Sequence, residues 1–571
     1  MKSSLFPSRS GSVRSRPIGA GALKNFAVAG TVFCLLGIGT AGANETSAES
    51  GEGEIFAVVR VAAPKQLTEK IMAVARKIQP GPQTEALPFM LGGMLGDPTL
   101  EGVSATENIG LALIANGEDI TPILLLKLTE ESPLRASLPN FEMTLLDFGG
   151  WTFGLQQGAS ATLLEGRQEA LISAVRAPRR YDLELTADGP ALARKLREAY
   201  QGFPDTDEMG NMIVRPLIEA LATEADAVQD FRVGFNLSGE EIQQFLFMEA
   251  VPGSAMAAFL NQKRPENMDF ARFIRADEAV AYLGGVDVQA TRQYFDHFID
   301  VLSGDTEGPG GELWQKFHDI GVQYLDRMDG RSGGVLSLDA MALQMVSIAP
   351  TSMSDEELLA LLAETVGTMG GIPTGDTEEG SPMTKYELLP NQLDVDGVAV
   401  HVMRTEVKFD PEAAAEIEEQ VPGFLMPEQR HDMHYAVVGG YMVNTSDIAR
   451  MKELIGAIQK DEAVENNLAT LIQVDEENLF EFQVNLLRYF GGIMAVMMPP
   501  DMSAVLQRLE SRNLKPMTGE ASARNGVAEV GVSIPVDTVA AVYQEVTAYM
   551  AAQREKEQEE QEEQELSPAN P

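Results

Sequence analysis

Four methionines in one short stretch are the densest group of potential ligand-binding side chains in the sequence. The stretch IMAVMMPPDM contains Met494, Met497, Met498 and Met502. Thioethers bind Cu(I) in oxidising compartments, and methionine also fills irregular cores and lines adaptable apolar grooves. Packing in a core explains the stretch most simply. The alternatives are a groove for an apolar ligand or a peptide, and a copper site.

Two histidines form a second candidate group. The sequence RHDMHY places His431 and His434 three residues apart. At this spacing two residues share a face of a helix and could bind a metal together, whereas on a strand they point to opposite faces. Because the stretch leads into the alternating sequence HYAVVGG, we expect a strand and ordinary loop or packed histidines. A metal site is the alternative, and no cofactor is predicted.

Familiar catalytic motifs do not accompany these residues. The sequence contains no G-x-S-x-G, no G-x-x-x-x-G-K-[ST] and no H-E-x-x-H. His297 and His318 lie in helical patterns beside Asp296 and Asp319, where they could act as bases, but no nucleophile motif is paired with them. The abundant carboxylates leave a carboxylate-dependent secreted hydrolase as an alternative function.

Residues 1–43 are predicted to be a secretory signal peptide. Basic residues without any acidic residue precede an apolar run over 26–38, which is shorter than the about 20 residues that cross a bilayer. The run ends in Ala41-Gly42-Ala43, a small-x-small pattern that predicts cleavage after Ala43. The single cysteine, Cys34, lies in this run, so disulfide and thiolate chemistry are excluded from the mature chain. An uncleaved anchor is the alternative.

The expected location is therefore periplasmic or extracellular, with a flexible linker over 44–53. The strongest apolar candidate in the mature chain, YFGGIMAVMMPP over 489–500, is too short to span a membrane and ends in two prolines. We therefore expect no transmembrane segment there.

The charge balance limits the partners that the protein can have. The chain has 43 Lys and Arg against 85 Asp and Glu, a net charge of −42. Such a surface repels nucleic acids and anionic lipid headgroups, so no nucleic-acid partner is expected. One basic island, over 176–180 and 194–197, could bind an anion or the acidic tail, although ordinary surface ion pairs are the simpler explanation. Residues 551–571 form a Glu- and Gln-rich tail, predicted to be a solvated helical extension or disordered.

Strands followed by helices recur along the chain. In YDLELTADGPALARKL, alternation ends at Asp188, which can cap a helix. FAVVRVAAPKQLTEKI, AVAYLGGVDVQATRQYF and VAEVGVSIPVDTVAAV follow the same plan. In FRVGFNLSGEEIQQFL, Ser238 and Glu241 form a capping box that predicts a helix after the strand.

A hairpin followed by a helix occurs twice. TFGLQQGASATLLEGRQEALISAV over 152–175 resembles YAVVGGYMVNTSDIARMKELIGAI over 435–458, and Leu171, Ile172 and Val175 align with three apolar residues of the second helix. Glycines predict turns at Gly158 and at 439–440. The similarity indicates an internal duplication, and chance recurrence of a common unit is the alternative.

The alternating strands predict an α+β fold, with two related units of mainly antiparallel sheet and helices packed on one face. The units are expected over 54–275 and 276–550, with loop insertions near 303–312 and 370–383. A parallel, doubly wound sheet is the alternative.

The order of these patterns, with GDPTLEGVSATENIGLALI and a final NGVAEVGVSIPVDTVAAV, resembles exported bacterial proteins of unknown function with duplicated α+β units. The resemblance implies no catalytic residue. We expect a non-catalytic role in binding, carriage or envelope organisation, with an apolar ligand or a protein as partner. The methionine stretch and the junction between the units are the expected binding places. A metal-handling protein is a further alternative.

Overall fold

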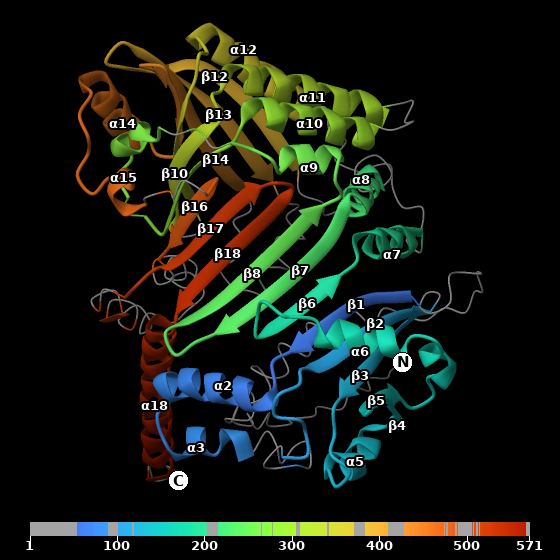
Figure 1. The fold of residues 1–571 in the computed structure, drawn as a ribbon. Coiled ribbons are helices and arrows are strands. Elements are labelled where there is room, and N and C mark those ends of the chain that lie inside the picture. The colour runs from blue at the N-terminus through green and yellow to red at the C-terminus, as the bar shows by residue number, and fades with distance from the viewer. Residues whose placement is uncertain are drawn as a thin grey trace, which may run out of the picture.

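The computed structural model contains one continuous antiparallel sheet of 18 strands, with helices beside it (Figure 1). It describes residues 54–89, 97, 101–116, 119–201, 215–263, 265, 267–276, 278–303, 309–339, 342–370, 383–408, 428–472, 474, 478–485, 488, 505, 508, 509, 512 and 514–566. Each strand pairing among these residues is antiparallel, so the α+β prediction is confirmed and the doubly wound alternative is wrong.

The strands of the first half come first along the sheet and those of the second half follow. The first half contributes, in spatial order, β4 (Met143–Phe148), β5 (Trp151–Gln156), β3 (Asp119–Leu126), β2 (Ile109–Asn116), β1 (Glu54–Val61), β6 (Leu183–Ala187), β7 (Val228–Leu237) and β8 (Glu241–Ala250). The second half continues with β18 (Val527–Pro535), β17 (Met517–Arg524), β16 (Phe480–Val484), β9 (Val280–Gly285), β10 (Arg331–Asp339), β11 (Ala342–Pro350), β15 (Tyr441–Thr445), β14 (Glu428–Val438), β13 (Val398–Lys408) and β12 (Met383–Val395).

The helices connect these strands. Those of the first half are α2 (Pro64–Ile78), α3 (Pro82–Glu85), α5 (Leu134–Ser137), η1 (Leu138–Phe141), η2 (Ala161–Leu164), α6 (Gln168–Arg176), α7 (Gly189–Gln201), α8 (Arg215–Asp226), α9 (Ala255–Phe259) and η4 (Asp269–Phe273). Those of the second half are α10 (Val288–Ser303), α11 (Pro309–Arg327), α12 (Asp355–Gly370), α14 (Ile448–Lys460), α15 (Leu468–Leu471) and α18 (Val536–Leu566).

The two halves share one strand order and one register. Read inward from the edge, β4-β5-β3-β2-β1-β6-β7-β8 is matched by β14-β15-β11-β10-β9-β16-β17-β18, and the hairpin β12–β13 is added at the far edge. Arg60 pairs with Gly110 on one side and Glu184 on the other. At the matching place in the second half, Leu283 pairs with Gly333 and Glu481.

The halves meet where β8 pairs with β18, and the contacts there are reciprocal. Phe245 lies opposite Gly531 at the centre of this pairing. At one end the N–H of Ala250 donates to the carbonyl of Gly526 at 2.8 Å, and at the other the N–H of Val536 donates to that of Glu240, also at 2.8 Å. The helix that follows β8, α9, packs on α10 of the second half, and the helix that follows β18 packs on α2 of the first half. Each half therefore contributes a helix to the other.

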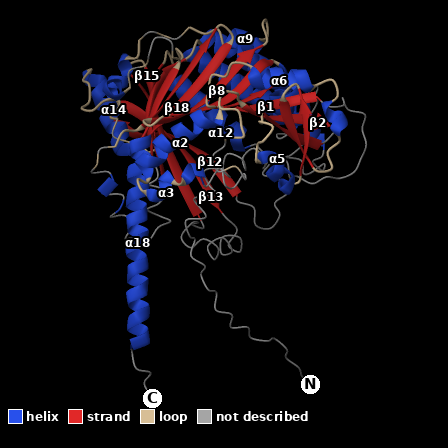
Figure 2. Cartoon of the chain, turned by 60° about the horizontal axis from the view of Figure 1, so that its bottom comes forward, coloured by secondary structure: helices blue, strands red, loops and turns tan. Residues whose placement is uncertain are grey.

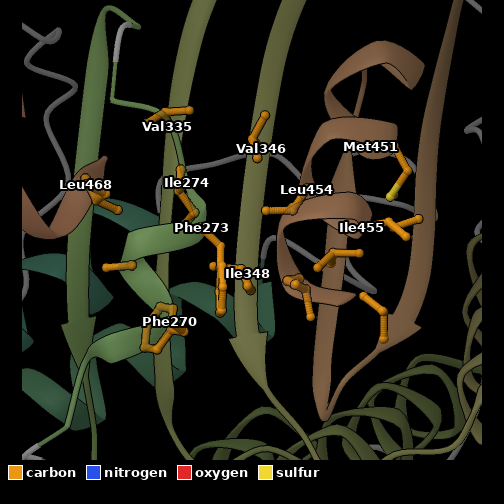
Figure 3. Close-up of a cluster of buried hydrophobic side chains, with 14 of the residues drawn as sticks. Phe270, Phe273, Ile274, Val335, Val346, Ile348, Met451, Leu454, Ile455 and Leu468 are labelled. Atoms are coloured by element: carbon orange, nitrogen blue, oxygen red, sulfur yellow. The ribbon is translucent and has the colours of Figure 1, made fainter. Parts of the chain in front are cut away.

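Apolar clusters hold helices against the outer strands on both faces of the sheet. On one face, α6 packs Leu171, Ile172 and Val175 against β1, β2, β3 and β5. In the second half, α14 covers the matching strands with Leu454 and Ile455, and Figure 3 shows this cluster. The opposite face is covered at its two ends by α5 with η1 and by α12.

The predicted capping box at Ser238 does not start a helix. Its hydroxyl does accept the N–H of Glu240 at 3.2 Å and that of Glu241 at 2.8 Å, as a cap would. These bonds instead close the turn between β7 and β8, because residues 241–250 continue as a strand. A short-range polar pattern serves a helix start and a tight turn equally well, and pairing with β18 decides between them here.

Two further expectations need correction, and one is decided between its alternatives. The first hairpin turns at Gly149 and Gly150, both with positive φ, and Gly158 lies beyond β5, in a segment with η2 that the second half lacks. The predicted loop over 303–312 is shorter, because α11 begins at Pro309, and proline suits a first helical position. For the tail, the predicted helical extension is observed over 551–566, since Glu, Gln, Lys and Arg are good helix formers. Figure 2 shows α18 extending well beyond the strands.

The predicted signal peptide, the linker over 44–53 and residues 371–382 of the second predicted loop lie outside the described residues. Within the part of the chain that the structure covers, no helix is long and apolar enough to cross a membrane.

Candidate binding surface at the junction of the halves

The junction is the group of four central strands β7, β8, β18 and β17. Figure 1 shows them between α2 and α18 on one side and α8, α9 and α10 on the other. Because strand side chains alternate, the registers assign each junction residue to one of two faces. The two faces differ sharply in chemistry.

One face is apolar. Its side chains, which we call the apolar junction face, are Phe231, Val233, Phe235, Leu237, Ile242, Gln244, Leu246, Met248, Ala528, Val530, Val532, Ile534, Gly519, Ala521 and Ala523. Gln244 is the one polar side chain among them. One end of the face is covered, because Phe231, Met248 and Ala528 pack with Met256 and Phe259 of α9. Most of the other large side chains are half-buried, and Leu246 is 37% exposed.

The backbone of the junction offers nothing to a ligand. The central strands β8 and β18 have a partner strand on both sides, whereas β7 pairs with β6 over 231–235 and β17 pairs with β16 over 517–521. The N–H and C=O groups there are occupied by the sheet. The apolar junction face can therefore contribute dispersion and hydrophobic contact to a ligand, and almost no hydrogen bonds.

The aromatic side chains of β16 extend this face. Phe480 and Phe482 are half-buried and lie next to β17 and β9 in the sheet. A Cβ on Gly519 would lie 2.0 Å from the ring of Phe482, and a Cβ on Gly284 would lie 2.6 Å from that of Phe480. The glycines thus let the rings lie flat on the strands, which widens the apolar surface.

The other face of the junction is polar. It carries Asp230, Arg232, Asn236, Gln243, Phe245, Phe247, Glu249, Glu529, Ser533, Thr518, Glu520, Ser522 and Arg524 with two glycines and a valine. Arg232 Nε donates to Asp230 at 2.8 Å, and the guanidinium groups of Arg180 and Arg232 lie 4.8 and 5.3 Å from the ring centre of Phe247. This face satisfies its charges internally or in water.

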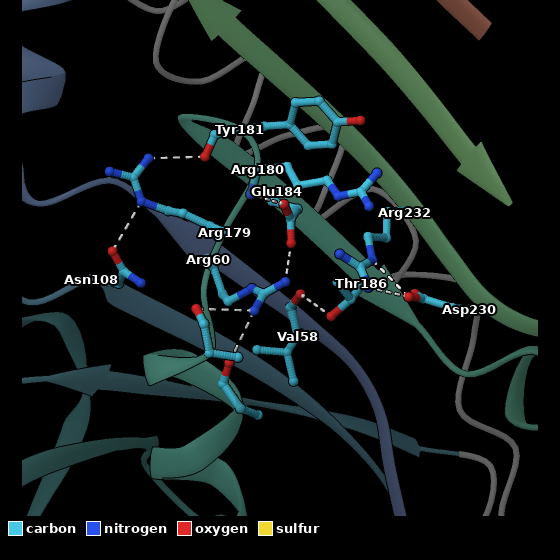
Figure 4. A network of polar contacts seen from close by, with 12 residues as sticks. Val58, Arg60, Asn108, Arg179, Arg180, Tyr181, Glu184, Thr186, Asp230 and Arg232 are labelled. Atoms are coloured by element: carbon cyan, nitrogen blue, oxygen red, sulfur yellow. Dashed lines mark hydrogen bonds and ion pairs between the residues drawn. The ribbon is translucent and has the colours of Figure 1, made fainter. Parts of the chain in front are cut away.

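A buried ion pair lies beside the polar face. It is formed at Arg60 of β1, the position that corresponds to Leu283 of β9 in the second half. Arg60 pairs with Glu184, and both side chains are buried (Figure 4). Arg60 also donates to the carbonyls of Ala174 and Ala177 at 3.4 and 3.3 Å, at the C-terminal end of α6. Burial lowers the pKa of Arg60, with a further contribution from nearby Arg232.

The second half lacks this arginine. Leu283 occupies the position of Arg60, while Glu481 corresponds to Glu184. Asn478 Nδ2 lies 3.2 Å from Glu481 and 3.1 Å from Glu520, its cross-strand neighbour. The ion pair therefore belongs to the packing of the first half, and the carboxylate-dependent alternative stays a prediction.

The basic island is held mainly by ordinary contacts. Arg197 pairs with Glu219 at 2.9 Å and Asp226 at 2.8 Å. Arg176 lies over Trp151, with 5.5 Å from its guanidinium carbon to the ring centre, and 3.6 Å from Glu107. Arg179 donates to Asn108, Gln66 and the carbonyl of Tyr181 at 2.9–3.1 Å.

A small hollow beside the start of α14 is lined by Val335, Val346 and Thr445. Arg450 pairs with Glu278 at 2.6 Å in its wall. Because the charged groups there bind each other, the hollow offers less to a ligand than the junction does.

The sequence-predicted site residues are not brought together. Met494, Met497, Met498 and Met502 lie outside the described residues. His431 and His434 lie on opposite faces of β14, opposite Thr405 and Val402. His434 Nδ1 lies 3.2 Å from the carbonyl oxygen of Thr445. Among the residues that the structure describes, no group of three or more His, Cys, Asp and Glu is arranged to hold a metal ion.

Sequence reasoning missed the residues of β8, because it assigned them to a helix. The alternation of apolar and polar residues that marks a strand is weak in β8. Phe245 and Phe247 lie on the polar face, so FLFM over 245–248 is a continuous apolar run. The opposite strand β18 alternates clearly and did identify Val530 and Val532.

No protein-family model, curated protein or solved structure matches this chain.

Proposed function

We propose that this protein is an exported, non-catalytic binding or carrier protein that holds an apolar ligand at the junction of its halves. The observation that carries the proposal is the apolar junction face, on which four neighbouring strands gather large half-buried apolar side chains around Leu246, which is 37% exposed. Contiguous exposed apolar surface on a protein of this kind marks an interaction site.

Export is supported by the sequence of residues 1–43. Amino-terminal sequencing of the protein from its native compartment tests it. A chain that begins at Asn44 agrees with the proposal, and one that begins at Met1 contradicts it.

The binding role is tested by the native mass of the mature chain, residues 44–571, purified without denaturant from its native compartment. A bound non-protein mass is expected. Leu246→Gln should lose it, because glutamine replaces the most exposed apolar side chain of the face and matches its neighbour Gln244.

Leu393→Gln is the matched control. Leu393 is also a strand leucine with 37% exposure, on β12 at the far edge of the sheet. Retention of the bound mass in this variant and its loss in Leu246→Gln supports the junction as the site. A bare chain in all three preparations contradicts the carrier function.

The matching strand order and registers support the inference that the halves arose by duplication of one unit. Such units should retain an affinity for each other through β8 and β18. Co-expression of residues 54–275 and 276–566 as separate chains should therefore give a complex that copurifies, and independent monomers would argue against it.

A further inference from the structure

We infer that the ligand of the apolar junction face is the hydrocarbon chain of a lipid with an uncharged or zwitterionic headgroup. This inference rests on the proposed function and specifies its ligand. It follows from the apolar side chains that the junction presents and from the hydrogen-bonding groups that it lacks.

An extended peptide is disfavoured by the hydrogen bonds that it needs, because each residue carries an N–H and a C=O that must be paired when they leave water. The central strands β8 and β18 have both of their sides occupied, and Gln244 is the one polar side chain on the face. A sugar has the same requirement through its hydroxyl groups. A hydrocarbon chain has no such groups, so its burial carries no penalty of this kind.

The dimensions suit an acyl chain. Beyond the end that α9 covers, residues 242–246 of β8 give a floor about 16 Å long. One acyl chain spans about half of the 30 Å hydrocarbon core of a bilayer. Such a chain fits on the strands with its headgroup at the margin of the face.

The charge of the protein selects the headgroup. The chain carries a net charge of −42, and such a charge disfavours the approach of an anionic headgroup. A zwitterionic or uncharged headgroup avoids this repulsion.

Isothermal titration of the mature protein with palmitoyl lysophosphatidylcholine tests the inference. Binding is expected, weakened about threefold to fivefold by Leu246→Gln, because the ligand buries the exposed third of the leucine side chain and would leave the glutamine amide without a partner. Leu393→Gln should bind as the parent does. Thermal unfolding of both variants confirms that they are folded.

Two further probes separate the possible outcomes. Palmitoyl lysophosphatidylglycerol has the same chain with an anionic headgroup and should bind at least about tenfold more weakly at low salt, with the difference shrinking as salt is added. An acetylated and amidated tetrapeptide of leucine and valine should not bind.

Junction binding of the peptide with none of the lipid would overturn this inference and leave the proposed binding function intact. Equal affinity for both headgroups at low salt would overturn the selection of the headgroup. Binding of lysophosphatidylcholine that is insensitive to Leu246→Gln would remove the junction as its site. A bare native mass together with the failure of all three probes would end the proposed function as well.

Discussion

The backbone N–H of Val536 donates to the carbonyl oxygen of Glu240 at 2.8 Å, across the boundary between the two halves of the chain. Val536 is fully buried and begins α18, and Glu240 lies in the turn between β7 and β8. The bond attaches α18, the last helix of the second half, to the first half.

This contact predicts that truncation after Pro535 destabilises α2. The truncation removes α18, whose Asp537 pairs with Lys77 at 3.0 Å and whose Tyr543 donates to Gln79 at 3.0 Å. Hydrogen exchange in residues 64–78 should accelerate, because an apolar helix face loses its cover. A chain that ends at Met550 is the matched control and should protect α2 as the full chain does. Unchanged exchange after truncation at Pro535 would show that α2 is held by the sheet alone.

The ion pair of Arg60 and Glu184 predicts a large effect of removing one partner. Both side chains are buried, with 5% and 0% exposure. Glu184→Ala should lower the free energy of unfolding by about 3–5 kcal/mol, because it leaves a buried guanidinium unpaired. The double variant Arg60→Met with Glu184→Leu should cost less than Glu184→Ala, since no charge is left in the interior.

Urea unfolding of these variants gives the comparison. Lys77→Met removes one partner of the exposed pair with Asp537 and should cost less than about 1 kcal/mol. A similar small loss for Glu184→Ala would mean that water reaches Arg60 in the folded protein.

His318 predicts a pH-dependent contact between α10 and α11. Burial lowers the pKa of its imidazole, but hydrogen bonds to Asp296 at 2.8 Å and Asp319 at 3.4 Å outweigh this and raise the pKa above its usual value. A group whose folded pKa is raised contributes stability below its unfolded pKa of about 6.5 and loses it as the pH rises through the folded value. Because Asp296 is 45% exposed, the contribution should be about 1 kcal/mol or less.

The free energy of unfolding should therefore differ between parent and His318→Gln at pH 5.5 and converge above neutrality. NMR titration of the imidazole measures the pKa directly. An unshifted pKa, or a difference that grows with pH, would contradict the assigned pairing.

The sequence predicted the elements well where local and tertiary preferences agree. Asp188 and Asp287 cap the helices that follow β6 and β9, as their position after alternating strands indicates, with bonds of 2.9 and 3.0 Å. The helix alignment of Leu171 with Leu454 also holds, since both are buried on the same face of the sheet. At Ser238 the same kind of local pattern failed, because pairing of β8 with a strand far along the chain overrides it.

The candidate site was harder to predict for the same reason. The apolar junction face combines Leu246 with Val530, which are distant in sequence and meet only through the pairing of the two halves. No local pattern encodes that pairing. The sequence-based choice of the junction as a binding place agrees with the proposal. The residues of the apolar junction face, in contrast, could be named only from the pairing of its strands.

We predict that the distal part of α18, residues 551–566, becomes more helical in acid. Residues 551–566 carry seven Glu, including Glu565 in the last turn, where negative charge opposes the helix dipole. Like charges at the three- and four-residue spacings of this sequence destabilise a helix at neutral pH. Protonation below about pH 4.3, or added salt at neutral pH, should remove this repulsion and increase helicity.

Circular dichroism of the full chain minus that of the chain ending at Met550 isolates the segment. Helicity in this difference should rise with salt and with acid, and replacement of Glu562, Glu563 and Glu565 by Gln should give the same rise at pH 7 and low salt. Replacement of Glu555 by Gln, one turn after Met550, is the control and should have a smaller effect, because that position is far from the negative end of the dipole. A loss of helicity with salt would instead mean that ion pairs such as Lys556 with Glu559 stabilise the segment.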